Sequence, residues 1–171
     1  LGVVIGKRAK YVSEEEALDH VAGYVLVNDL SERFDQHQRG GSWDKGKGHD
    51  GFGPVGPWLV TRDELGDARG LSLQLDLNGK RMQDGNTDEM KWDMHYLVAD
   101  IARTITLQPG DILLSGTPAI SRTVYPGDVV EVGVEGLGTL RNHIVEGPTP
   151  IRSDVGAQPT ESEEVLSTAQ G

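Results

Sequence analysis

The chain has 171 residues, enough for one domain with a buried core. Its 16 basic and 27 acidic side chains give a formal net charge of −11, and this negative field excludes nucleic acid and anionic membrane surfaces as expected partners. The sequence contains no cysteine, which excludes disulfides and thiol nucleophiles, and it has no apolar run long enough to span a membrane. We also expect no signal peptide before the first strand. We therefore expect a cytoplasmic protein.

The first third of the chain predicts two strands around a short helix. Residues 1–6 have the composition of a buried strand already under way, so we expect a processed chain or a fragment of a longer protein. Residues 13–16 spell a capping box, which predicts a helix to about residue 21. Residues 23–29 predict a strand buried on both faces that delivers Asn28 and Asp29 at its end.

Residues 34–56 are rich in glycine and charge and show no hydrophobic period. A loop of this length inside a compact domain is usually functional or disordered. Trp43 and Phe52 favour an ordered, functional loop. A strand is expected to restart at residues 57–61.

The second half predicts more strands and one longer helix. Residues 71–77 alternate apolar and polar, and Asn78-Gly79 predicts a type I′ hairpin turn. Residues 93–105 predict a helix with one apolar face, formed by Met94, Leu97, Val98, Ile101 and Ile105. Further strands are expected at residues 111–115, ending in a Gly-Thr-Pro turn at residues 116–118, and at residues 129–134 and 139–145.

These elements predict a β-rich α+β fold with two helices among about eight strands. The domain is expected to cover residues 1–146. Residues 147–171 are polar and rich in proline, serine and glutamate, which predicts a tail that is disordered or ordered only by docking.

Three features of the sequence suggest chemistry, and each has a plain alternative. Asp29 follows a buried strand, so its carboxylate must be paired, hydrogen-bonded or metal-bound, unless it only caps a turn. Lys47, between glycines, suits an oxyanion or a ligand carboxylate, although such loops are commonly solvated turns. The pair Gly116-Thr117 could offer amides and a hydroxyl to an anion, or simply end a strand. The five histidines show no metal-ligand spacing and are expected to be surface or packing residues.

Six segments occur in one order that resembles the catalytic domain of the fumarylacetoacetate hydrolase family. They are residues 1–6, 23–33 (GYVLVNDLSER), 43–58 (WDKGKGHDGFGPVGPW), 78–87 (NGKRMQDGNT), 107–118 (LQPGDILLSGTP) and 126–142 (PGDVVEVGVEGLGTLRN). The resemblance implies a mixed β-sandwich or roll with few short helices. It also implies a homodimer that acts on small 2-oxo acids with Mg²⁺ or Mn²⁺.

The resemblance also implies roles for individual residues. Asp29 matches a metal ligand of the family. Arg33, Gln36 and Lys47 match groups that bind the oxo oxygens and the developing oxyanion. Gly116 and Thr117 match the turn that binds the substrate carboxylate.

Three departures from the family pattern stand out, and one is that residues 119–125 are shorter than the glycine-rich stretch usual at this place in the family. In the family, a Glu-x-Glu with two more metal ligands comes just before the segment that matches residues 1–6, and a lid lies further upstream, so we expect a truncated sequence. Phe34 stands where the family usually has aspartate.

The expected activity is hydrolysis of a carbon–carbon bond in an acylpyruvate or 2,4-diketo acid, through a metal-stabilised enolate. The stretch around residues 40–48 is most similar to members acting on diketo sugar acids, often described as ureidoglycolate lyase-like. Isomerisation, decarboxylation and ureidoglycolate cleavage are alternatives that use the same enolate chemistry. A non-catalytic binding module that keeps the fold without the metal is the alternative from another class, and a structural subunit ranks last.

Overall fold

The computed structural model describes residues 1–39, 41–118, 122–147, 149, 152 and 154. They form two compact units. The first comprises Leu1–Val27 and Val55–Val145, and the second comprises Asn28–Pro54 with the described residues beyond Val145. Most of the expected tail, residues 147–171, lies outside the described residues.

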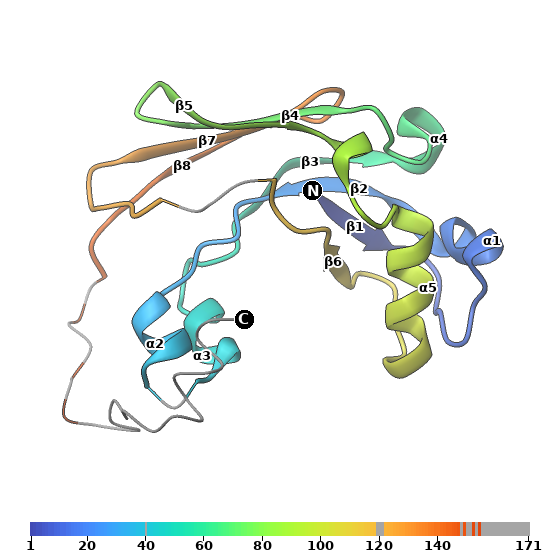
Figure 1. Ribbon diagram of the computed structural model, residues 1–171, viewed down its shortest axis with the longest axis horizontal. Coiled ribbons are helices and arrows are strands. Elements are labelled where there is room, and N and C mark those ends of the chain that lie inside the picture. Colours follow the sequence, from blue (N-terminus) through green and yellow to red (C-terminus); the bar gives the residue numbers. More distant parts are fainter. Residues whose placement is uncertain (40, 119–121, 148, 150–151, 153, 155–171) are drawn as a thin grey trace. The chain divides into compact units, whose positions relative to one another are not determined.

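One antiparallel sheet of the first unit has the strand order β3-β2-β1-β6 (Figure 1). Its strands are β1 (Gly2–Ile5), β2 (Val21–Val27), β3 (Val55–Thr61) and β6 (Ile112–Leu114). The central strands β1 and β2 are largely buried, as their apolar runs predict. Strand β6 is one residue shorter at each end than the strand expected before the turn at residues 116–118, because its neighbour in the sheet is the four-residue β1.

The second antiparallel sheet has the order β5-β4-β7-β8. Its strands are β4 (Ser72–Leu77), β5 (Lys80–Asn86), β7 (Val129–Val134) and β8 (Gly138–His143). Asn78 and Gly79 have φ angles of 52° and 76°, so the predicted type I′ turn is confirmed. The Asn78 side chain also accepts the N–H of Val129 at 2.8 Å, which ties the turn to β7.

Short helices fill the connections, and one longer helix packs on the core. They are α1 (Glu14–Ala17), the 3₁₀ helix η1 (Leu18–His20), α2 (Arg33–His37), α3 (Trp43–Lys47), α4 (Arg62–Leu65), the 3₁₀ helix η2 (Thr87–Glu89) and α5 (Met94–Thr104). The capping box of α1 is confirmed, because Ser13 and Glu16 exchange both bonds. The expected apolar face of α5 is wrong at Ile105, which is 59% exposed, because the helix ends at Thr104 and Ile105 is extended.

The two sheets and α5 share one hydrophobic core. Its buried side chains include Val3, Ile5, Tyr24, Leu26, Val98, Ala102, Val134, Leu137 and Leu140. Burial raises the pKa of Tyr24 to about 12, and its hydroxyl donates to the carbonyl of Gly66 at 3.1 Å.

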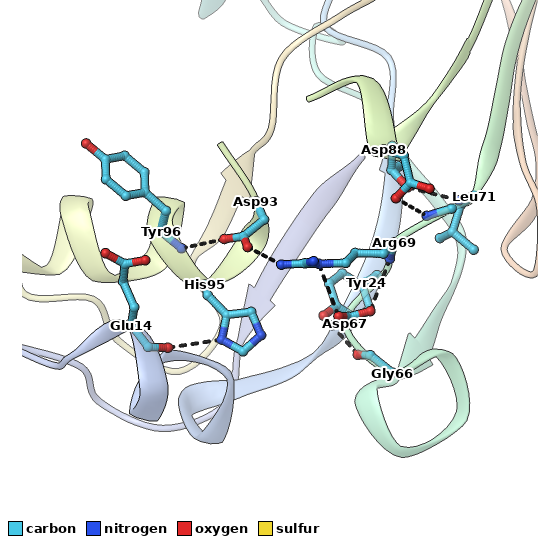
Figure 2. Close-up of polar contacts among 12 residues, drawn as sticks. Glu14, Tyr24, Gly66, Asp67, Arg69, Leu71, Asp88, Asp93, His95 and Tyr96 are labelled. Carbon is cyan, nitrogen blue, oxygen red and sulfur yellow. Dashed lines mark hydrogen bonds and ion pairs between the residues drawn. The ribbon is translucent and has the colours of Figure 1, made fainter. Parts of the chain in front are cut away.

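Polar contacts fasten the start of α5 (Figure 2). One carboxylate oxygen of Asp93 accepts the N–H of Tyr96 at 2.9 Å and the other accepts from Arg69. The Tyr96 N–H and then Arg69 lower the pKa of Asp93 below its ordinary value. His95 Nδ1 lies 3.0 Å from the carbonyl oxygen of Glu14, so α5 is tied to α1 as well.

The α+β fold with two antiparallel sheets and few short helices is confirmed. Two expected helices become five α-helices among the described residues, because α2, α3 and α4 have only four or five residues each and leave no period in the sequence. Within the same residues, no helix combines the length and apolar character needed to cross a membrane.

Candidate active site

The candidate residues Asp29, Arg33, Gln36 and Lys47 all lie in the connection between β2 and β3. The strand expected to reach Asp29 ends at Val27, and a hydrogen bond from the N–H of Asn28 to the carbonyl of Pro54, 3.1 Å long, closes the base of the connection. Asn28 is buried, whereas Asp29 follows it into solvent. A backbone hydrogen bond therefore holds the two ends of the connection together.

Two short helices replace the loop predicted for this segment. The Glu32 side chain accepts the N–H of Phe34 at 2.8 Å at the start of α2, and Ser42 Oγ accepts that of Lys45 at 3.4 Å at the start of α3. Each helix has five residues, too few for a hydrophobic period, so these capping side chains were the only local signal.

The helices α2 and α3 pack with almost no space between them. The N–H of Glu32 donates to the carbonyl of Gly46 at 2.8 Å. A Cβ atom on Gly46 would lie 2.4 Å from Cβ of Gln36, which is far inside van der Waals contact. Only glycine at position 46 permits this approach.

Lys47, the last residue of α3, pairs with Asp29. Its Nζ lies 2.6 Å from Oδ2 of Asp29, and the two side chains are 28% and 51% exposed. Asp29 is paired, but the burial on which this expectation rested is wrong, because half of its side chain is exposed. An ion pair this accessible contributes about 0–1 kcal/mol, so its main effect is to place an ammonium beside a carboxylate.

Arg33 and Gln36 form a second cluster on α2. Arg33 Nη1 donates to Oε1 of Gln36 at 2.6 Å. Gln36 is fully buried, and its Nε2 has no hydrogen-bond partner among the described residues. A buried amide N–H without an acceptor costs about 1–3 kcal/mol, so an oxygen ligand at this nitrogen would relieve a real penalty.

Gly116 and Thr117 belong to the other compact unit and follow β6. Gly116 has a φ of 100°, a conformation that favours glycine, and Thr117 Oγ1 donates to Oε1 of Gln83 in β5 at 3.4 Å. The turn belongs to a different compact unit from Asp29 and Lys47, and its role in binding a carboxylate stays a prediction.

The described residues supply only one carboxylate for the expected cation. Among them, no three histidine, aspartate or glutamate side chains are grouped as metal ligands. Asp29 could be one oxygen ligand, but a single exposed carboxylate paired with an ammonium does not make a divalent cation site.

Sequence reasoning missed a contact of His49, which was expected to be a surface or packing residue. Its Nε2 lies 3.1 Å from Oδ2 of Asp35 in α2, and its ring packs 5.1 Å from that of Phe52. The partners Asp35 and His49 are 14 positions apart, so no local pattern reveals them.

The fold and the site together define an α+β domain whose β2–β3 connection carries ammonium, guanidinium and amide donors. The chain belongs to the fumarylacetoacetate (FAA) hydrolase C-terminal family, whose profile matches residues 1–145. The resemblance drawn from the six sequence segments is thereby confirmed.

Named relatives include hydrolases and isomerases. A 2,4-didehydro-3-deoxy-L-rhamnonate hydrolase of Sphingomonas sp. (strain SKA58) is 53% identical over 154 residues, which is 85% of this chain and 54% of that protein. The crystal structure of a 5-carboxymethyl-2-hydroxymuconate delta-isomerase from Mycobacterium smegmatis matches with a TM-score of 0.81 at 37% identity, covering 86% of this chain and 57% of the other.

A third relative was solved with ligands. The structure of fumarylpyruvate hydrolase from Pseudomonas aeruginosa, in complex with Mn²⁺ and pyruvate, matches with a TM-score of 0.76 at 30% identity, covering 84% of this chain and 63% of the other. The chain spans about half the length of the curated relatives it matches.

Proposed function

We propose that the whole protein hydrolyses a carbon–carbon bond in an acylpyruvate or 2,4-diketo acid. Support comes from the names of the relatives, two of which are hydrolases of 2-oxo acids or their diketo sugar counterparts. In this reaction water adds to the distal carbonyl, the carbon–carbon bond breaks, and its electrons pass to the enolate of pyruvate. A proton then completes pyruvate, and the acyl part leaves as a carboxylic acid.

The observation that carries the proposal is the buried amide N–H of Gln36, for which the described residues offer no acceptor, beside the guanidinium of Arg33. Donors fixed before the reaction stabilise negative charge on oxygen at little reorganisation cost. We assign the N–H groups of Gln36 and Arg33 to substrate oxygens. The ammonium of Lys47 would face the oxygen on which charge develops.

Asp29 would be one ligand of a divalent cation, Mg²⁺ or Mn²⁺, and this cation, when bound, would neutralise charge on the 2-oxo acid. The described residues offer no complete ligand set, so none of the steps assigned above depends on the cation. Replacing Asp29 with alanine should abolish Mn²⁺-dependent turnover by the whole protein. Unchanged turnover would remove Asp29 from the metal site.

The test of the function measures pyruvate release from acetylpyruvate by the whole protein, followed with lactate dehydrogenase. Lys47→Met should lower kcat about 100-fold, since removing one oxyanion donor typically costs this much. Lys45→Met, on the same helix and exposed, is the matched control and should stay within twofold of the wild type. Wild-type rates in Lys47→Met would contradict the assignment.

Isomerisation is the second candidate, favoured by the similarity to the M. smegmatis isomerase. An isomerase would change the ultraviolet spectrum of a hydroxydiene diacid without releasing pyruvate. Binding of pyruvate without turnover of either substrate class would instead identify a non-catalytic module.

A further inference from the structure

The side chain of Asp35 is enclosed between two cations or potential cations of the same unit. Its Oδ2 lies 3.1 Å from Nε2 of His49, and its Oδ1 lies 3.7 Å from Nη1 of Arg39, two residues beyond the end of α2. The side chains of Asp35, Arg39 and His49 are 15%, 10% and 23% exposed, so this cluster is more withdrawn from water than the pair of Lys47 and Asp29.

The cluster joins the two helices that carry the candidate donors. Asp35 directly precedes Gln36 on α2, and His49 follows Lys47 by two residues at the end of α3. Phe52 packs against the imidazole ring, and its N–H donates to the carbonyl of His49 at 2.9 Å, so His49 has a ring contact and a backbone contact besides Asp35.

Lys47 needs such an anchor. It ends a five-residue helix, which is too short to be stable alone, and its ammonium stands on a flexible four-carbon stem. The carboxylate that it meets, Asp29, is itself half exposed. A misplacement of about 1 Å in a reacting group can cost about 100-fold in rate, so the end of α3 has to be held in place.

We propose that the Asp35–His49 contact is a positioning element that holds the end of α3 against α2 and thereby places the ammonium of Lys47. The inference rests on the proposed function, because it gives Lys47 a role toward a substrate oxygen. His49 and Asp35 act through Lys47 and are positioning residues.

The test is a double-mutant cycle on acetylpyruvate turnover by the whole protein. His49→Leu keeps an apolar side chain against Phe52 but removes the nitrogen that faces Asp35, and it should lower kcat about tenfold with less than a twofold change in KM. His49→Gln, whose amide nitrogen can reach the same place, should recover kcat to within about threefold of the wild type. In the Lys47→Met background, His49→Leu should change kcat less than twofold.

Two results would overturn the inference: an equal loss from His49→Leu in both backgrounds, or a His49→Gln variant no better than His49→Leu. The matched control is Asp50→Ala, an exposed neighbour whose side chain makes no described polar contact, and it should keep wild-type turnover.

Amide hydrogen exchange provides a readout that does not need activity. Residues 43–48 should exchange at least tenfold faster in His49→Leu than in Asp50→Ala, and equal exchange rates would overturn the anchoring. Failure of the wild-type protein to turn over or bind any 2-oxo acid would defeat the proposed function, while the exchange comparison would still decide whether His49 anchors α3.

Discussion

Replacing Gly46 with alanine tests the close packing of the two short helices. The added Cβ would lie 2.4 Å from Cβ of Gln36, 2.9 Å from its Cα and 3.0 Å from the carbonyl oxygen of Glu32. Ordinary carbon–carbon contacts are about 3.5–4.0 Å, so α3 must move away from α2 by about 1 Å.

This displacement separates Lys47 from Gln36. A shift of about 1 Å in a positioned group can cost about 100-fold in rate, so kcat/KM for acetylpyruvate should fall by roughly that factor. Overpacking costs about 1–3 kcal/mol and alanine returns about 1 kcal/mol of helix propensity, so the free energy of unfolding should fall by at most about 2 kcal/mol. Activity should therefore suffer much more than stability.

The assay compares turnover and urea unfolding of the whole protein for Gly46→Ala and Lys45→Ala. Lys45 is exposed on the same helix, so its replacement should leave both quantities near wild type. Wild-type turnover in Gly46→Ala would refute the argument, because it would mean that the spacing of α2 and α3 does not set the donor geometry.

Three further predictions concern the first compact unit. Asp93→Ala should lower the free energy of unfolding by about 1 kcal/mol at pH 7 through loss of a helix cap. The Tyr96 N–H, and then Arg69, hold the pKa of Asp93 below its ordinary value. This stabilisation is therefore complete above about pH 4 and disappears as the pH falls through the lower folded-state pKa. The urea midpoints of the variant and the wild type should converge in acid. In ultraviolet absorbance Tyr24 should titrate at a pKa of about 12, and its stabilisation should be present below about pH 10 and lost as the pH rises through 12. A titration curve unchanged by Tyr24→Phe would contradict this. Thr117→Val should raise KM for acetylpyruvate about tenfold with little change in kcat if its hydroxyl binds the substrate carboxylate, and an unchanged KM would exclude that role.

Most of the fold was predictable because its signals are local. The alternation in residues 71–77 and the Asn78-Gly79 pair specify a strand and its turn without reference to the rest of the chain. The capping box at residues 13–16 likewise specifies where α1 begins.

The errors fall where the neighbours decide the outcome. Strand β6 is short because its partner β1 is short, and Ile105 is exposed because α5 ends one residue before it. Neither the length of the partner strand nor the exact end of the helix can be predicted from the local sequence pattern.

The site was predictable only in part. The apolar run before Asp29 predicted a buried carboxylate, but the structure leaves half of the Asp29 side chain exposed and pairs it with Lys47. The contact of Asp35 with His49 was not predictable, because it arises only once Gly46 lets α3 lie directly on α2. The roles of Arg33 and Gln36 came from the family resemblance rather than from any physical feature of the sequence.

The most direct test of the proposed site observes the side-chain amide of Gln36 by nuclear magnetic resonance, in the whole protein labelled with nitrogen-15 at glutamine. Addition of pyruvate should shift the Nε2 resonance of Gln36, because a substrate oxygen would accept the hydrogen bond that no described residue accepts. The Gln38 amide, on the exposed face just beyond α2, serves as the reference and should not move. A Gln36 resonance that stays unchanged at saturating pyruvate would contradict the assignment of this cluster to the binding of a 2-oxo acid.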